Sequence, residues 1–306
     1  YCYARSVLSF RHMWDSDQPA IADYAKIEKI FEDVLIKHKK TKYSELINAR
    51  IPIRLGGMTD CFACNEANNG ITLKVLELLK RYQYPYLILT KSALLASKSY
   101  LMALDPDLAY IQYTITTPFD DISRRFEPGA DVTSDRLYSC QKLVDEGFYV
   151  AARLNPLFPK YPDGWYSQKR DLNDDNIKMR FRYFDWCLID LFGAANIQTV
   201  ICGFVRLSSW NIRWIRESTG VDLSYLFDPA MKQSNQALHF STSEKRYYYE
   251  NIRNMCKQHG MDFTVCYDGD DAYEEFRYLW ANQNDCCNGT GHIPGFTTSW
   301  DAFRRP

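Results

Sequence analysis

The sequence predicts an α/β fold in which parallel strands, each followed by a helix, form a barrel or a partial barrel. First, short strand-like runs alternate with helical stretches along most of the 306 residues. Second, these runs are rich in apolar and β-branched residues, as expected of parallel strands covered on both faces. Third, no internal repeat, low-complexity tract or long linker interrupts the alternation. A doubly wound sheet is the alternative, but so many successive units favour the barrel.

Local patterns define the individual elements. Residues 22–40 carry apolar positions at helical spacing, and residues 51–56 form a strand that ends in glycines. Residues 70–83 place their apolar side chains on one helical face, and a helix at 133–146 follows a polar cap. The other predicted elements are strands at 85–90, 109–116, 148–154, 198–204 and 262–267, and helices at 93–103, 175–193 and 243–259.

Composition limits the class of protein. Hydrophobic residues make up 46% of the chain, and the formal net charge of -1 creates no overall attraction to nucleic acid or acidic lipid. No apolar run reaches the ~20 residues of a membrane span, so we expect no membrane partner. The 10 cysteines of so long a chain indicate reduced thiols and a cytoplasmic location.

We expect a barrel core over 1–240 and a last helix–strand unit with a C-terminal extension over 241–306.

Chemistry in an α/β barrel sits at the carboxyl ends of the strands. Unusual residues follow four of the predicted strands. They are Gly56-Gly57-Met58-Thr59-Asp60, Thr90-Lys91-Ser92, the threonines Thr114, Thr116 and Thr117, and Arg153-Leu154-Asn155-Pro156.

Each of these groups also has an ordinary explanation. Gly56 and Gly57 permit either a ligand close to the backbone or a tight turn. Lys91 suits a carboxylate but is more often solvated, and Thr116 suits a ribose hydroxyl or an ordinary strand. Arg153 closes a buried strand and needs an anionic partner, either a ligand or a structural carboxylate. Together, at successive strand ends, these residues predict one polar cup with several hydrogen-bond donors.

The first five residues, YCYAR, resemble part of an iron–sulfur motif. Radical S-adenosylmethionine (SAM) enzymes carry three cysteines spaced C-x3-C-x2-C, and in the spore-photoproduct-lyase-like branch the third stands in a YCYAR-type segment. Cys2 matches this third cysteine, and we expect the other two to precede Tyr1 in a longer natural chain. Further segments resemble the same branch in order: LGGMTDCFACNE at 55–66, ILTKSAL at 88–94, IQYTITT at 111–117, RRFEPGADVTSDR at 124–136 and VAARLNPLFP at 150–159.

The resemblance implies a partial (β/α)6 barrel of the TIM type, with the first strand and most of the cluster loop outside the sequence. It implies a [4Fe–4S] cluster with Cys2 as a ligand, SAM as second cofactor, and an electron donor such as flavodoxin or ferredoxin. One-electron cleavage of SAM then gives a 5′-deoxyadenosyl radical that abstracts hydrogen. The implied cofactor-binding residues are Tyr3, Gly56, Gly57, Met58, Thr59, Asp60, Lys91, Ser92, Thr116, Arg153 and Asn155.

The cysteines depart from the pattern of the branch. Spore photoproduct lyases place a hydrogen-donating cysteine just before the Thr/Ser-Asp stretch, where this chain has Gly57, which argues against repair of the spore dimer by that route. Cys61 and Cys64 follow in a CxxC arrangement. Cys61 is our candidate for hydrogen donation, although two small buried side chains are an equally good interpretation. A weaker signal, for an auxiliary cluster, comes from Cys266, Cys286 and Cys287.

Three functions are compatible with the sequence. The first is radical SAM chemistry on a nucleic acid or nucleotide; the basic and aromatic segments 124–126 and 245–249 suit it, though solvated helix faces explain them as well. The second is the same chemistry on a peptide or small metabolite, because fold and cofactor do not decide the substrate. The third is a non-catalytic barrel that binds a partner, because the sequence contains one cysteine of the cluster motif.

Overall fold

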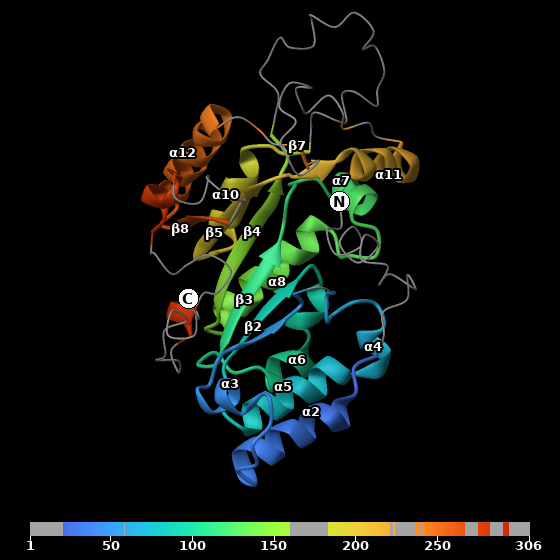
Figure 1. Cartoon of the computed structure of the whole chain (residues 1–306). Coiled ribbons are helices and arrows are strands. Elements are labelled where there is room, and N and C mark those ends of the chain that lie inside the picture. The colour runs from blue at the N-terminus through green and yellow to red at the C-terminus, as the bar shows by residue number, and fades with distance from the viewer. Residues whose placement is uncertain are drawn as a thin grey trace, which may run out of the picture.

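One six-stranded parallel sheet organises the computed structural model, which describes residues 21–57, 59–159, 183–220, 223, 237–238, 240, 242–266, 275–281 and 290–293. The strands, in spatial order, are β1 (Ile53–Leu55), β2 (Tyr86–Thr90), β3 (Ala109–Thr114), β4 (Tyr149–Leu157), β5 (Thr199–Phe204) and β8 (Asp262–Val265). Each pairs in parallel with the next. β1 and β8 form the two edges, so the sheet stays open (Figure 1). The predicted α/β class with parallel strands is confirmed, and the open sheet is consistent with a partial barrel.

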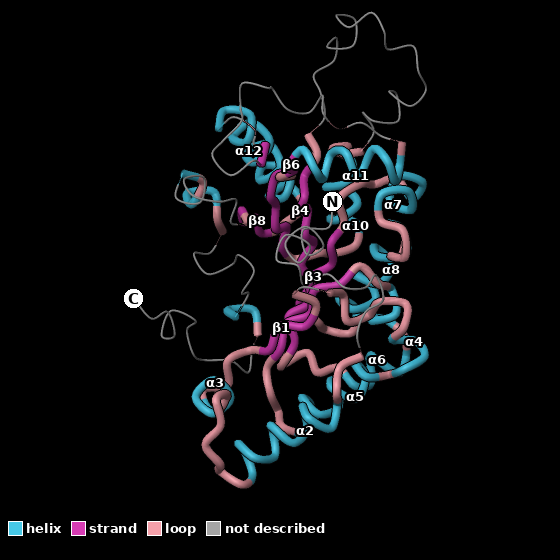
Figure 2. Tube along the Cα trace, turned by 45° about the vertical axis from the view of Figure 1, so that its right-hand side comes forward, coloured by secondary structure: helices cyan, strands magenta, loops and turns pink. Residues whose placement is uncertain are grey.

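Helices connect the strands and cover the sheet. In Figure 2, α5, α6 and α8 lie along one side of the strands. The helices before β4 are α2 (Tyr24–Phe31), continued by the π-helical turn η1 (Glu32–Ile36), α3 (Ser44–Asn48), α4 (Glu66–Asn69), α5 (Ile71–Arg81), η2 (Ala93–Ala96), α6 (Lys98–Ala103), α7 (Asp120–Phe126) and α8 (Thr133–Asp145). After β4 come α10 (Cys187–Ala194), α11 (Ser209–Thr219), α12 (Thr242–Gln258) and the short 3-10 turns η6 (Arg277–Leu279) and η7 (Thr290–His292).

Most predicted elements are present, with shifted boundaries. The helix predicted at 70–83 is α5, which buries the apolar face that the spacing predicted. The helix predicted at 22–40 ends at Ile36, because the charged run 37–40 offers no apolar side chain to bury. The helix predicted at 175–193 begins only at Cys187, where the Asp185 carboxylate accepts the Cys187 N–H at 3.1 Å. Residues 175–182 lie outside the described part.

Helix α11 was not predicted, although the sequence holds a signal for it. Ser208 and Asn211 form a reciprocal capping box, in which each side chain accepts the other residue's backbone N–H at 3.2 Å. The helix ends at Thr219, and the capping residue Gly220 has a φ of 71°, which favours glycine. Beside it, β6 (Leu207–Ser208) and β7 (Ala237–Leu238) form a small antiparallel pair.

The two faces of the sheet bury different side chains. Successive residues of a strand point to opposite faces, and on the helix-covered face Ile88, Ile111 and Val150 join the main core. A second cluster on the inner face contains Leu87, Tyr110, Ala151, Ile201, Cys266 and Ile293. Nearer the carboxyl edge the inner face becomes polar, with Gln112 and Arg153 fully or almost fully buried. Buried polar groups need hydrogen-bond partners, so this edge must hold groups that bond to Gln112 and Arg153.

β8 extends the same sheet by pairing with β5, so the last helix–strand unit shares the sheet with the preceding units. The division at residue 240 stays a prediction. Within the described residues, no helix combines the length and apolar character that crossing a bilayer requires.

Candidate functional site

The candidate site lies at the carboxyl edge of the sheet, where the loops after β1, β2, β3 and β4 meet. The pairing register brings the strand ends level: Thr90 pairs with Tyr113, and Thr114 pairs with Arg153. Helices α7 and α11 lie near this edge (Figure 1). They are joined there by Arg125, whose Nε donates to the carbonyl of Thr219 at 3.1 Å.

The glycine pair after β1 serves two purposes. Gly56 has a φ of 88°, and a Cβ at this position would lie 2.0 Å from the carbonyl oxygen of Leu89. The close approach at Gly56 is therefore to the backbone of β2. Gly57 is different, because among the described residues the nearest neighbour of a Cβ there is the side chain of Arg54, at 3.7 Å. Of the two, only Gly57 has no clash between an added Cβ and the described residues, and Met58 lies outside those residues.

Asp60 ties the loop after β1 to the end of β2. Its carboxylate accepts the Thr90 hydroxyl at 2.9 and 3.0 Å, the backbone N–H of Lys91 at 2.7 Å and that of Phe62 at 2.9 Å. These bonds give Asp60 an organising role for the TKS segment. Its neighbour Thr59 is exposed.

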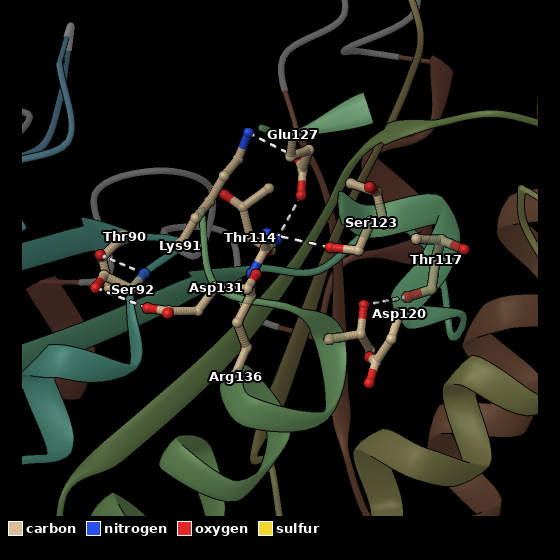
Figure 3. A network of polar contacts seen from close by, with 12 residues as sticks. Thr90, Lys91, Ser92, Thr114, Thr117, Asp120, Ser123, Glu127, Asp131 and Arg136 are labelled. Atoms are coloured by element: carbon tan, nitrogen blue, oxygen red, sulfur yellow. Dashed lines mark hydrogen bonds and ion pairs between the residues drawn. The ribbon is translucent and has the colours of Figure 1, made fainter. Parts of the chain in front are cut away.

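Ser92 and Lys91 both connect to the stretch after α7. The Ser92 hydroxyl donates to Asp131 Oδ2 at 2.9 Å, and the backbone N–H of Ala93 donates to the same oxygen. The Lys91 ammonium lies 2.8 Å from Glu127 Oε1. Figure 3 shows the Lys91 side chain reaching Glu127 from one side while Arg136 approaches from the other.

Arg136 is the centre of this network. Its guanidinium donates to Glu127 Oε2 at 2.6 Å, to the Thr114 carbonyl at 2.8 Å, to the Asp131 carbonyl at 2.6 Å and to the Ser123 hydroxyl at 3.3 Å. Two cations share one carboxylate, so Lys91, Glu127 and Arg136 together carry a net positive charge. Burial raises the pKa of Glu127, and the Arg136 cation beside it acts in the opposite direction. Glu127 and Arg136 both lie in the family-like segment 124–136, and the sequence alone predicts no role for either.

The threonines after β3 are bonded within the fold. The Thr116 hydroxyl lies 3.0 Å from the Tyr183 hydroxyl, and both residues are buried. The Thr117 carbonyl accepts the Thr133 hydroxyl at 2.8 Å, at the start of α8. Thr116 therefore has a protein partner at the position predicted to hold a ribose.

Arg153 points across the inner face of the sheet. It donates to Gln112 Oε1 at 3.0 Å on β3, and its Nη2 lies 3.4 Å from the Cys266 thiol beyond β8. All three residues are buried. Asn155 follows on the same strand face and covers Gly203 of β5, where a Cβ would lie 2.8 Å from Asn155 Nδ2.

The cysteines predicted to do chemistry are placed differently from one another. Cys61 is partly buried, packs against the helix-side core and has its thiol pKa raised by burial. Cys64 is exposed, with its thiol 3.7 Å from Asn65 Oδ1. No group of three or more metal-ligating side chains gathers within the described ranges. The other predicted positions, Cys2, Tyr3, Cys286 and Cys287, lie outside those ranges.

The two basic and aromatic segments are largely built into the fold. Arg125 caps the end of α11, as described above. In α12, Lys245, Tyr248 and Tyr249 are buried, while Arg246 pairs with Glu275 at 2.6 Å. These segments therefore give little support to a nucleic-acid surface.

The fold and the site together define an open, parallel α/β sheet of the partial-barrel class with a cup of charged and polar side chains at its carboxyl edge. The fold is similar to spore photoproduct lyase complexed with dinucleoside spore photoproduct, with a TM-score of 0.56 and 17% identity over 86% of this chain and 72% of that chain. A variant of that lyase with bound AdoMet and dinucleoside spore photoproduct has a TM-score of 0.53 and 17% identity, over 87% of this chain and 71% of that chain. No family model and no curated protein matches the sequence. The resemblance predicted from the sequence is confirmed at the level of the fold.

Proposed function

We propose that the protein is a radical SAM enzyme that removes a hydrogen atom from its substrate. The observation that carries this proposal is the position of Gly57, Lys91 and Arg153 at the carboxyl edge of a sheet with the fold of spore photoproduct lyase. The resemblance assigned these residues to SAM, and the register of the strands brings them to that edge. One of the similar structures contains bound AdoMet.

The side chains at this edge suit the chemistry of SAM. The ligand's carboxylate suits the Lys91 ammonium, and its amino group suits the backbone carbonyls at Gly56–Met58, where Gly57 carries no side chain. Arg153 and Asn155 supply further donors on the inner face, and Ser92 and Thr116 are proposed for the ribose. Asp60 acts through the backbone of Lys91, which it holds in place, and Thr59 lies exposed beside it.

The N-terminal segment is proposed to bind the iron–sulfur cluster. Cys2 is the proposed iron ligand, with Tyr3 beside it, and flavodoxin or ferredoxin is the proposed electron donor. When bound, the cluster and SAM supply the one-electron chemistry that yields a 5′-deoxyadenosyl radical, while the protein provides ligation, orientation and exclusion of water. Such a cluster requires reduced thiols, which agrees with a cytoplasmic location.

For the substrate, we propose a nucleic acid or nucleotide. The support is that the similar lyase structures are described with a dinucleoside photoproduct. Cys61 is the proposed hydrogen donor. Because burial raises its thiol pKa, Cys61 stays protonated at neutral pH, and a protonated thiol is the form that can give up a hydrogen atom. A peptide or small metabolite is the alternative substrate.

The decisive experiment uses the natural full-length protein. It is loaded anaerobically with iron and sulfide, reduced, and supplied with SAM, and 5′-deoxyadenosine is measured by chromatography. We expect the product from the wild type, none from Cys2→Ala, and a normal yield from Cys64→Ala, whose thiol is exposed. A protein that carries the cluster yet leaves SAM intact would refute the proposal.

The substrate class is tested separately. Binding of labelled single- and double-stranded oligonucleotides is measured at two stated salt concentrations, because phosphate contacts make the affinity salt-dependent. Saturable binding that weakens with salt supports a nucleic-acid substrate. Absence of binding, combined with SAM cleavage, favours the peptide or metabolite.

A further inference from the structure

The network at Lys91, Glu127 and Arg136 has an uneven distribution of exposure. The Lys91 side chain is 30% exposed, whereas the side chains of Arg136 and Glu127 are only 1% and 3% exposed. A ligand approaching the edge of the sheet can therefore reach the Lys91 ammonium without displacing the buried pair behind it.

The backbone of Lys91 is anchored on both sides. Its N–H donates to Asp60 Oδ2 at 2.7 Å, and its carbonyl accepts the Asp131 N–H at 3.2 Å. The position of the side chain's base is thus fixed, while the four-carbon stem of a lysine allows the ammonium to move.

The contact between Lys91 and Glu127 is held by charge. The ammonium lies 2.8 Å from Glu127 Oε1, yet that oxygen accepts no hydrogen bond of good geometry from the part of the chain that the structure describes. Oε2 accepts from Arg136 at 2.6 Å. If Lys91 turned away, Glu127 would keep Arg136 as its buried cationic partner. Moving the Lys91 ammonium therefore costs less free energy than leaving a buried carboxylate without any cation would.

We infer that Glu127 is an internal competitor for Lys91, whose ammonium moves from Glu127 to the carboxylate of SAM when SAM binds. Glu127 is a positioning residue: it aims the ammonium at the cup in the ligand-free state and lowers the affinity for SAM by the strength of its own ion pair. This inference rests on the proposed function, because the ligand is the SAM of that proposal.

The test measures binding, without turnover. SAM affinity of the full-length, cluster-loaded and unreduced protein is determined by equilibrium dialysis for the wild type and Glu127→Gln. The introduced amide can still accept from Arg136 but has no charge to hold Lys91. We expect Glu127→Gln to bind SAM about fivefold more tightly, the size of a partly exposed ion pair. Unchanged or weaker binding overturns the inference and assigns Glu127 a purely structural role.

Two controls make the result specific. Decarboxylated SAM lacks the group that Lys91 is proposed to hold, so Glu127→Gln must bind it no more tightly than the wild type does; equal tightening for both ligands overturns the inference. In a Lys91→Met background, Glu127→Gln must give no tightening of SAM binding. If tightening persists there, Lys91 is not the group that exchanges.

The outcomes separate this inference from the proposed function. A wild type that binds no SAM refutes the proposed function itself, whereas a wild type that binds SAM with no gain in Glu127→Gln refutes the exchange alone. If Glu127→Gln does not fold, a crystal structure of the wild type with SAM decides: Lys91 on the SAM carboxylate supports the exchange, and Lys91 still on Glu127 overturns it.

Discussion

The guanidinium of Arg153 lies 3.4 Å from the thiol of Cys266, although β5 separates β4, which holds Arg153, from β8, which Cys266 follows. Gly203 of β5 lies between Asn155 and Cys266, because a Cβ there would lie 3.2 Å from Cys266 Cβ and 2.8 Å from Asn155 Nδ2. The absent side chain at Gly203 therefore leaves room for Asn155 and Cys266 on the inner face of the sheet.

Gly203→Ala is expected to displace Asn155 and to lower the free energy of unfolding by about 1–3 kcal/mol, the range for overpacking. Urea denaturation measures the change. Adding Asn155→Ala should recover part of the loss, because it removes the nearest clashing atoms; strictly additive losses would contradict the proposed clash. Gly57→Ala is the control for adding a methyl group at this edge, because the added Cβ would lie 3.7 Å from its nearest described neighbour, the Arg54 side chain.

Gly56→Ala tests the close approach between β1 and β2. The φ values of Gly56 and Gly129 are 88° and 84°, but a Cβ at Gly129 would meet none of the described residues within 4 Å. Gly129→Ala should therefore cost only the conformational penalty, about 1 kcal/mol. Gly56→Ala should cost at least about 2 kcal/mol more, because it also collides with the Leu89 carbonyl. Thermal or urea unfolding of the two variants gives the comparison, and equal losses would argue against the collision.

Asp60→Ala removes the acceptor for the Thr90 hydroxyl and the Lys91 N–H. We expect a loss of about 1–3 kcal/mol in unfolding free energy, because those donors lose their protein acceptor in a partly buried site. Native-state hydrogen exchange should show faster exchange at the Lys91 amide. Asp60→Asn keeps an acceptor oxygen and is the matched control; a larger loss in Asp60→Asn than in Asp60→Ala would show that the bonds are not the cause.

Arg153→Gln tests the proposed SAM site. Loss of the cation should weaken SAM binding by about tenfold or more, as expected for a hydrogen bond to a charged group. Equilibrium dialysis on the cluster-loaded, unreduced protein measures the affinity, and urea unfolding measures stability in parallel. Arg213→Ala, on the exposed side of α11, is the charge-matched control. Unchanged affinity in Arg153→Gln would remove Arg153 from the site.

Alkaline pH should destabilise the fold through buried thiols. Burial raises the pKa of Cys256 to about 12 from 9.0, so the folded state keeps a proton that the unfolded state loses. This contribution to stability is complete below pH 9 and is lost as pH rises toward 12, at about 1.4 kcal/mol per pH unit. Urea unfolding between pH 8 and about pH 11 should show a shallower decline for Cys256→Ala than for the wild type. Parallel declines would contradict the burial of a protonated thiol.

The sequence by itself determined the parallel α/β fold and the strand ends predicted to carry the chemistry, because apolar periodicity and strand–helix alternation are local signals. Only the tertiary structure decided what those ends do. In the folded chain Gly56 packs against the Leu89 carbonyl, and the Asp60 carboxylate accepts the Lys91 N–H. Lys91 forms an ion pair with Glu127, which lies far from it along the chain. Pairings of this kind depend on strand register and on the cost of burying unpaired charge, and neither is a property of a local run of residues.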